Sequence, residues 1–406
     1  MTLLYDPADR AVLRNPYPLF ARMRAEDPVH WSPKLSSWVV TSYAHAGTVL
    51  ASSAFSSDRL SPFYKRSSDA ERSTLSEVMR YIGLWLVFRN PPEHTRLRRL
   101  MNTAINPGIV TGMQPGINSI VHSLLDRIDT DGEFDFMSDF AVQLPAMVIM
   151  DMLGVPRDML FTIKAWSDDL INFVGSPRSV DDKYERARSG VVAMADFFRD
   201  LIRQRRQNPE NDILTMLIQA RDEHQSMLSD DELVASAMLL LFAGHETTTS
   251  LLGNAMLALH ENPDQMDKLR RHPELADTAV EEFLRFDGPV LSVSRVVAKP
   301  HELGSKALEE GNRIFVMIAG ANRDPAVFND PESLDLTRTP NRHITFGKGP
   351  HFCLGAPLAR LETKIALNEI LSRYRTIEVT RRPEDLEWID AMVMRGVRSL
   401  PMRVKR

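Results

Sequence analysis

The stretch Phe346–Gly355, FGKGPHFCLG, holds the only cysteine of the 406-residue chain. Its glycines predict a tight bulge whose backbone takes angles that a side chain would forbid and passes close to a flat group. Free N–H groups in such a bulge can point at the Cys353 sulfur and temper its basicity. A lone thiolate can be the axial ligand of haem iron, where it favours cleavage of an O–O bond. An oxidising enzyme is therefore the first hypothesis, and a buried, inert cysteine is the alternative.

The spacing within this stretch resembles the haem-binding loop of the cytochrome P-450 family, at Phe346, Gly347, Gly349, His351, Cys353 and Gly355. Three further stretches resemble the same family and follow its order: Ala243–Thr248, Glu282–Arg285 and Ala321–Pro325. The likeness extends over essentially the whole chain, which looks like the soluble bacterial branch. It implies haem b (iron protoporphyrin IX), held between a long central helix and the cysteine loop of a mainly α fold with a small β region.

Composition gives independent limits on the class of protein and its compartment. With 43% hydrophobic and 25% charged residues the chain is an ordinary globular protein. One cysteine excludes an internal disulfide and any four-cysteine zinc or iron–sulfur site made by this chain alone, and it fits a reducing cytoplasm. The first residues lack a signal-peptide pattern, no run of about eighteen apolar residues follows, and a net charge of -5 gives no reason to expect nucleic acid. We expect a cytoplasmic protein without a membrane anchor.

Hydrophobic periodicity predicts one mainly helical domain over residues 1–406. Amphipathic runs typical of helices lie at Ile117–Ile128, Val191–Arg206 and Leu358–Tyr374. Strand-like alternation occurs around residues 38–41 and 313–318, and the last thirty or so residues look similarly irregular. No internal repeat or Gly/Ser linker divides the chain.

The most informative helix is predicted to begin at Ser229, which forms a capping box with Glu232, and to continue to about His260. Ala243 and Thr247 share a face of it, and a threonine hydroxyl that bonds back to the preceding turn can open the helix and leave a groove for dioxygen. Glu246 then carries protons inward and Thr247 holds the water that delivers them, as the family uses the corresponding acid and alcohol. The alternative is a helix kink with a satisfied buried acid.

Glu282 and Arg285 are three residues apart on the predicted helix Asp277–Phe286 and can form an ion pair. By resemblance their role is structural: the pair locks the helix to the segment before the cysteine loop, where His343 or Arg338 completes the network. Their loss is expected to prevent haem uptake.

The two propionates of a haem need cations or other donors. His94 and Arg98 are four residues apart on a helix whose start is marked by prolines. By resemblance, Arg295 and His351 are the other propionate contacts. The alternative, ordinary surface cations, is preferred for Arg96 and Arg99.

Electrons must come from elsewhere, because no dinucleotide-binding fingerprint is present and only about fifty residues follow Cys353. The family implies a ferredoxin with its reductase, or a flavodoxin, as the donor. Lys348, Arg360 and Lys364 are expected on the thiolate side, where they attract an acidic donor or are merely solvated.

The resemblance places an apolar substrate pocket at Ile82, Leu84, Trp85, Val87, Leu239, Ala243, Val290, Leu291, Val293, Met392 and Val393. A hydrophobic small molecule follows, with terpenoid, macrolide, fatty acid and aromatic substrates all open and secondary metabolism as the expected setting. The predicted reaction inserts one atom of O2 into a C–H or C=C bond. A peroxide-driven peroxygenase and a non-catalytic haem gas sensor or carrier are the alternatives, but neither needs the pair Glu246–Thr247.

Overall fold

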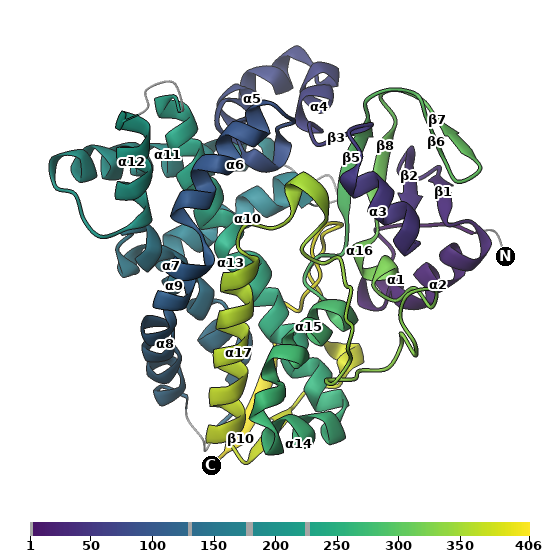
Figure 1. Cartoon of the computed structure of the whole chain (residues 1–406), viewed down its shortest axis with the longest axis vertical. Coiled ribbons are helices and arrows are strands. Elements are labelled where there is room, and N and C mark those ends of the chain that lie inside the picture. The colour runs from purple at the N-terminus through teal and green to yellow at the C-terminus, as the bar shows by residue number, and fades with distance from the viewer. Residues whose placement is uncertain (1–2, 129–131, 176–181, 224–227) are drawn as a thin grey trace.

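The protein is described here by a computed structural model, which covers residues 3–128, 132–175, 182–223 and 228–406. Helices dominate, as the periodicity predicts, and a small sheet region packs at one side of them (Figure 1). The helices are α1 (Arg10–Arg14), α2 (Tyr17–Glu26), α3 (Tyr43–Ala51), α4 (Leu60–Arg66), α5 (Asp69–Ile82), α6 (Glu93–Ala104), α7 (Pro107–Gly112), α8 (Gln114–Asp126), α9 (Gln143–Leu153), α10 (Leu160–Gly175), α11 (Lys183–Gln207), α12 (Ile213–Glu223), α13 (Asp230–Glu261), α14 (Pro263–Arg271), α15 (Ala276–Asp287), α16 (Ile318–Ala321) and α17 (Ala356–Arg373).

The strands form three small sheets. They are β1 (Val29–Ser32), β2 (Ser37–Val40), β3 (Phe55–Ser56), β4 (Phe134–Asp135), β5 (Val293–Val297), β6 (His301–Leu303), β7 (Lys306–Leu308), β8 (Arg313–Val316), β9 (Thr376–Val379) and β10 (Pro401–Lys405). The largest sheet has the order β1-β2-β8-β5-β3, in which β2 and β8 are parallel and the other neighbours antiparallel. Sequence alternation therefore located β2 and β8 correctly.

The long helix α13 crosses the helical part of the molecule, and most of its residues between Leu233 and Leu259 are buried. Its 32 residues span ~48 Å at 1.5 Å per residue. The predicted capping box is confirmed: Glu232 N–H donates to Ser229 Oγ, and Ser229 N–H donates to the Glu232 carboxylate at 2.8 Å. α13 is a continuous α-helix past Gly244 and Thr247, so the opened turn expected there is not seen.

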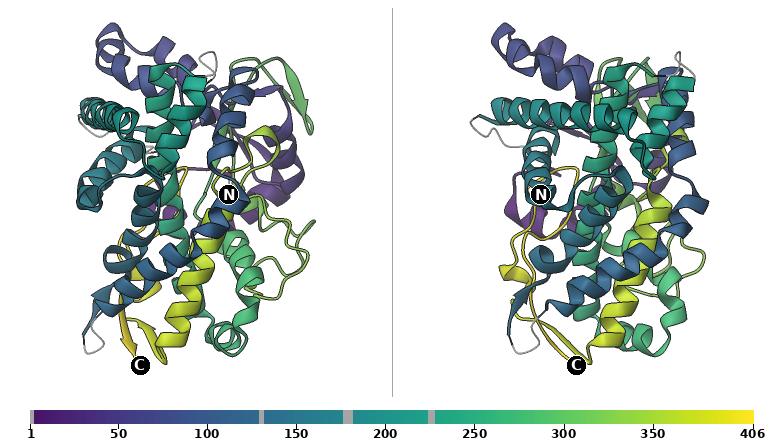
Figure 2. Two further views of the ribbon diagram at one scale, coloured as in Figure 1. Left: turned by 60° about the vertical axis from the view of Figure 1, so that its left-hand side comes forward. Right: turned by 90° about the vertical axis from the view of Figure 1, so that its left-hand side faces the viewer.

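The helix α17 begins directly after the cysteine loop and runs lengthwise between α8 and α15 (Figures 1 and 2). Its apolar residues Leu358, Ile365 and Ile370 are buried in the main hydrophobic core. The amphipathic runs predicted for α8, α11 and α17 are confirmed. Because α17 is packed on two sides, the cysteine at its start is held in a fixed place relative to α13.

The ion pair of Glu282 with Arg285 on α15 is confirmed, with two contacts of 2.8 Å and both side chains fully buried. Arg285 also donates to the carbonyl oxygens of Asn322, Pro331 and Ser333, which ties α15 to the segment before the cysteine loop. Arg338 completes the network by contacting both carboxylate oxygens of Glu282 at 3.1 and 3.2 Å.

Of the two side chains expected to complete this network, Arg338 does so and His343 does not reach Glu282. Its Nε2 lies 3.0 Å from a carboxylate oxygen of Glu281, the residue before Glu282. Neighbouring residues of a helix face directions ~100° apart, so the two acids bind different partners.

No helix among the described residues has the length and apolar character that a membrane crossing needs.

Candidate active site

The cysteine loop has the backbone that its glycines predict. Gly347 and Gly349 adopt positive φ angles of 77° and 72°, in the left-handed region that favours glycine. The Cys353 N–H donates to the Phe346 carbonyl at 2.8 Å and closes the bulge. Gly355 has an ordinary φ of -81°, but a Cβ there would meet no atom within 4 Å. Gly355 therefore adjoins open space in the cavity that it lines.

The sulfur of Cys353 lies at the N-terminus of α17. Burial raises the pKa of its thiol and outweighs the backbone N–H groups of Gly355 and Ala356 and the positive charges of Arg98 and Arg360, which act in the opposite direction. Donors directed at the sulfur therefore exist, as the loop sequence predicts. Such donors and the positive end of a helix favour a thiolate, the form that ligates metals.

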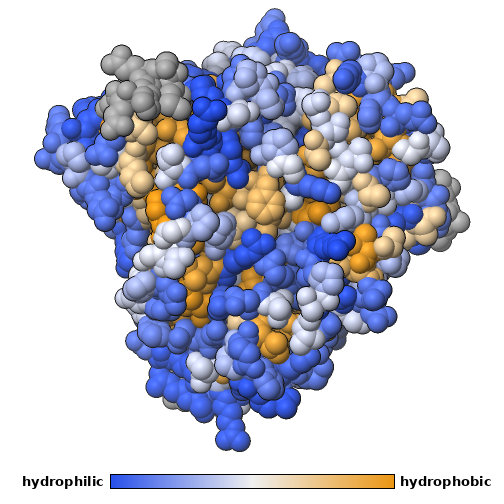
Figure 3. Space-filling model, in the orientation of Figure 1, coloured by the Kyte–Doolittle hydropathy of each residue, from blue (hydrophilic) through white to orange (hydrophobic). Residues whose placement is uncertain are grey.

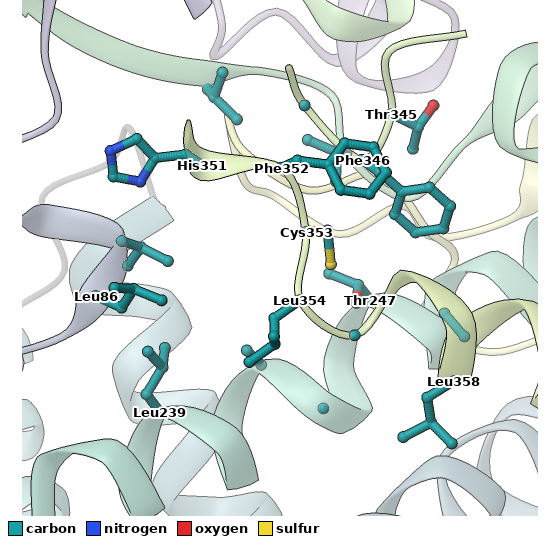
Figure 4. Close-up of a pocket in the computed structure, with 18 of the residues that line it drawn as sticks. Leu86, Leu239, Thr247, Thr345, Phe346, His351, Phe352, Cys353, Leu354 and Leu358 are labelled. Atoms are coloured by element: carbon teal, nitrogen blue, oxygen red, sulfur yellow. The ribbon is translucent and has the colours of Figure 1, made fainter. Parts of the chain in front are cut away.

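A cavity of about 340 Å³ lies between α13 and the cysteine loop. Figure 4 shows the sulfur of Cys353 pointing away from its loop, with Thr247, Leu239 and Leu86 among the surrounding side chains. The predicted haem contacts that line the cavity are His94, Arg98, Ala243, Arg295, Phe346, Gly347, His351, Cys353 and Gly355. Residues far apart in the sequence thus converge on one space, whose exposed lining is mainly apolar.

Of the predicted substrate contacts, Val87, Leu239, Ala243, Val290 and Val293 line this cavity. The other six lie outside its lining: Ile82, Leu84, Trp85, Leu291, Met392 and Val393. Ile82 and Trp85 are buried in the main core, and Leu291 and Met392 in a second hydrophobic cluster. These side chains have the apolar character of a pocket wall because core and pocket need the same residue types.

Several lining residues were not predicted, namely Leu50, Leu86, Met101, Ile149, Leu240, Thr248, Leu251 and Ile318. Leu86 directly precedes the predicted Val87, and Leu240 follows the predicted Leu239, so a wider window around each would have found them. Nothing in the sequence separates Leu50, Ile149 or Ile318 from ordinary core residues.

Basic side chains gather at one side of the cavity. His94 is 2% exposed, and its ring centroid lies 4.1 Å from that of His351. Burial lowers the pKa of Arg295 to about 10, and burial together with the neighbouring positive groups lowers that of His351 to about 3. Among the described residues no carboxylate forms a salt bridge with Arg98 or Arg295. The charges of these two guanidinium groups are therefore not compensated by a carboxylate of the described residues.

Arg59 belongs to this cluster and was not predicted. It precedes α4, and its guanidinium stacks on the Phe88 ring at 4.2 Å. Burial and the charges of Arg295 and Arg313 lower the pKa of Arg59 to about 9. By contrast, the surface role preferred for Arg96 and Arg99 agrees with the structure: Arg96 bonds to Glu232 at the start of α13, and Arg99 is exposed.

These features fit a haem. A sulfur with directed N–H donors faces a cavity, a missing Cβ at Gly355 leaves room for a flat ring, and uncompensated cations stand where two propionates would be neutralised. The described residues contain no group of three His, Cys, Asp or Glu side chains suited to bind a bare metal ion.

Glu246 and Thr247 are adjacent in sequence and lie in different surroundings. Thr247 lines the cavity, whereas Glu246 is buried outside the cavity lining. Its Oε1 lies 3.0 Å from Nε2 of His245 and 3.5 Å from Nζ of Lys164 on α10. Burial alone would raise the pKa of Glu246, but these two neighbours outweigh it and hold the pKa below its usual value.

The cations expected to attract an electron donor are mostly paired. Arg360 contacts Glu281, and Lys364 contacts Asp277 at 2.8 Å. Lys348 is exposed and reaches the cavity edge. The molecular face in Figure 3 is largely hydrophilic, with apolar side chains gathered in hollows near its centre, and Phe352, beside the cysteine, is 42% exposed.

Comparisons with known proteins agree with this site. A family model described as cytochrome P450 matches residues 62–398. The biotin biosynthesis cytochrome P450 of Bacillus subtilis is 35% identical over 96% of this chain and 95% of its own length. The vitamin D(3) 25-hydroxylase of Pseudonocardia autotrophica is also 35% identical, over 96% of this chain and 94% of its own length. The crystal structure of P450BioI in complex with acyl carrier protein bearing hexadec-9Z-enoic acid has 32% identity and a TM-score of 0.89, covering 97% of this chain and 99% of that one. The chain therefore belongs to the cytochrome P450 family and is a monooxygenase of that family.

Proposed function

We propose that this protein binds haem b with Cys353 as the axial ligand and uses it to insert one oxygen atom of O2 into a hydrophobic small molecule. The single observation that carries the proposal is the convergence of the Cys353 sulfur, Thr247 and apolar side chains on one cavity. When bound, a thiolate-ligated haem supplies activation of dioxygen. The proposed unit is one domain over residues 1–406, acting in the cytoplasm.

Four groups would hold the haem carboxylates: His94, Arg98, Arg295 and His351. Arg98 and Arg295 have no carboxylate partner among the described residues, so an anionic ligand would neutralise their charges, while His94 and His351, whose pKa values are lowered, would act as neutral N–H donors. Arg59 adds a third guanidinium to this side. Gly347 and Gly355 line the cavity and carry no side chain, so a flat ring would be able to approach their backbone.

The proposed proton path begins at Glu246 and ends at Thr247. Lys164, which contacts Glu246, has a side chain that is 28% exposed, so the carboxylate stands between solvent and the cavity. Thr247 presents its hydroxyl on the cavity wall and can hold a water there. Ala243, one turn earlier, leaves space beside it.

The substrate class follows from the cavity wall. Leu86, Val87, Leu239, Val290 and Val293 offer no charge, so they select an apolar molecule or an apolar portion of one. Two of the similar proteins support this substrate class. One is a vitamin D(3) 25-hydroxylase, and the other was crystallised with a fatty acyl chain on an acyl carrier protein. A ferredoxin with its reductase, or a flavodoxin, is proposed as the electron donor.

The test combines spectroscopy with isotope labelling. Reduced holoprotein with carbon monoxide should show the long-wavelength Soret band of thiolate-ligated haem, and Cys353→His should abolish it. A panel of terpenoids, macrolides, fatty acids and aromatics is then screened for a haem absorption shift. Hits are incubated with ¹⁸O₂, NADPH, a ferredoxin and its reductase.

Incorporation of one labelled atom into the product supports the monooxygenase. Labelled product only from H₂¹⁸O₂ would make the protein a peroxygenase. Binding of gases without turnover of any hit would make it a sensor or carrier, and an imidazole-type band in the wild type would refute the ligand assignment.

A further inference from the structure

Glu281 on α15 joins three elements around the cysteine loop. Its carboxylate accepts from Nε of Arg360 on α17 at 2.5 Å and from Nη2 at 2.8 Å, and it lies 3.0 Å from Nε2 of His343. Burial would raise the pKa of Glu281, but the bonds from Arg360 and His343 lower it to about 2. The carboxylate is therefore charged at any working pH and fixes the Arg360 guanidinium in a bidentate grip.

Arg360 in turn lies against the cysteine loop. Its guanidinium carbon is 4.5 Å from the centroid of the Phe346 ring, and the Phe346 carbonyl accepts the Cys353 N–H at 2.8 Å. Direct contacts therefore run from Glu281 through Arg360 and Phe346 to Cys353. The Arg360 charge also acts on the thiol electrostatically, in the direction that favours the thiolate.

We propose that Glu281 and Arg360 form a positioning pair that sets the positive potential at the Cys353 sulfur and thereby the reduction potential of the haem bound there. This rests on the proposed haem site. The proposal gives Arg360 a role other than binding the electron donor, because its guanidinium is paired with the Glu281 carboxylate. The two residues act through Phe346 and the field at the sulfur and touch no reacting atom.

The sign of each effect follows from electrostatics. Reduction of the haem adds one negative charge, so a nearby positive charge stabilises the reduced form and raises the potential. Loss of Arg360 should lower the potential, while loss of the Glu281 charge should raise it, because Arg360 is then uncompensated. The side chains are 36% and 27% exposed, so solvent screens part of both effects.

The chain contains a matched control on the same two helices. Asp277 and Lys364 pair at 2.8 Å one turn away from Glu281 and Arg360, in each case on α15 and α17. Their side chains are 73% and 40% exposed, and no ring links them to the cysteine loop in the described contacts. The same charge changes made there should leave the potential close to the wild-type value.

The experiment is a spectroelectrochemical titration of substrate-free holoenzyme. The variants are Glu281→Gln, Arg360→Gln, the double variant, Arg360→Lys, Asp277→Asn and Lys364→Gln. We expect Arg360→Gln to lower the reduction equilibrium constant at least twofold and Glu281→Gln to raise it at least twofold, about 18 mV each at 59 mV per decade. The double variant should return towards wild type, and Arg360→Lys, which keeps the charge, should shift less than Arg360→Gln.

Potentials that move no further than those of the Asp277 and Lys364 variants, or that move in the same direction for both single variants, would overturn the proposal. Loss of haem from both Glu281→Gln and Arg360→Lys would also overturn it, by showing a purely structural pair. A wild-type protein without the thiolate band would instead refute the proposed haem site itself, which separates the two failures.

Discussion

Lys164 on α10 lies 3.5 Å from the carboxylate of Glu246 on α13, so a residue from a neighbouring helix holds the buried acid next to the cavity. The same ammonium also contacts Asp168 one turn further along α10. Lys164 is thus shared between a buried and a half-exposed carboxylate. Lys164 is partly exposed, so the position of α10 would influence the proposed proton path through Glu246.

Thr247→Ala should leave the haem spectrum unchanged and reduce the product formed per NADPH consumed. The hydroxyl is lost from the cavity wall, while every proposed haem contact remains, so reducing equivalents should leave as hydrogen peroxide. NADPH, peroxide and product are measured together with a bound substrate. Thr249→Ala, on the same helix but outside the cavity lining, is the control, and an equal loss of coupling in both variants would contradict the assignment.

Glu246→Gln should slow turnover by ~10²-fold while NADPH consumption falls in parallel, because an amide cannot transfer a proton as an acid does. Steady-state rates in H2O and D2O measure the proton-coupled step. Lys164→Met provides the comparison, since it removes one positive neighbour but keeps a carboxyl group that can transfer a proton, and it should retain more turnover than Glu246→Gln. Wild-type rates in Glu246→Gln would make this acid structural.

Arg98→Gln should speed haem loss, because it removes a cation that has no carboxylate partner among the described residues. Haem transfer to an excess of apomyoglobin measures the rate. Arg99→Gln is a close control: the next residue on α6 is exposed and lies outside the cavity lining. If both variants release haem equally fast, the cation cluster does not hold the propionates.

Arg285→Ala should yield little haem protein. The change leaves Glu282 buried with less positive charge beside it and removes donors to three carbonyl groups, a loss of ~3–5 kcal/mol in unfolding free energy. Purified haem content and thermal midpoint are measured against Arg342→Ala, a change at an exposed arginine of the same segment. Normal haem content in Arg285→Ala would show that the network is dispensable.

Stability should depend on pH through Glu281. Its pKa is lowered to about 2 in the folded protein and is ~4.3 in an unfolded chain, so its stabilising effect is complete above pH ~4.3 and is lost as the pH falls towards 2. The difference in thermal midpoint between wild type and Glu281→Gln should therefore shrink over this window. A difference that stays constant from pH 6 to pH 3 would contradict the assigned pKa.

Local sequence patterns predicted the elements well because their causes are local. Glycines at 347 and 349 require left-handed backbone, and Ser229 with Glu232 caps α13 whatever surrounds it. Which partners the Glu246 side chain contacts could not be predicted from local sequence. This depends on Lys164, which reaches Glu246 only after α10 packs nearby, and the competition of His343 and Arg338 for Glu282 was likewise decided by tertiary placement. Substrate contacts were found only in part, because apolar walls and apolar cores share one composition.

The parallel pairing of β2 with β8 joins Trp38 to Ile314, two residues far apart in the sequence. During synthesis at ~5–20 residues per second, β2 waits on the order of tens of seconds for its partner strand to leave the ribosome. Until then the edge of β2 that pairs with β8 in the folded protein, with the apolar Val39 and Val40, has no partner strand. Nascent-chain protection by chaperones is therefore expected to matter most for the first forty residues, and fragments that end before β8 should aggregate when expressed alone.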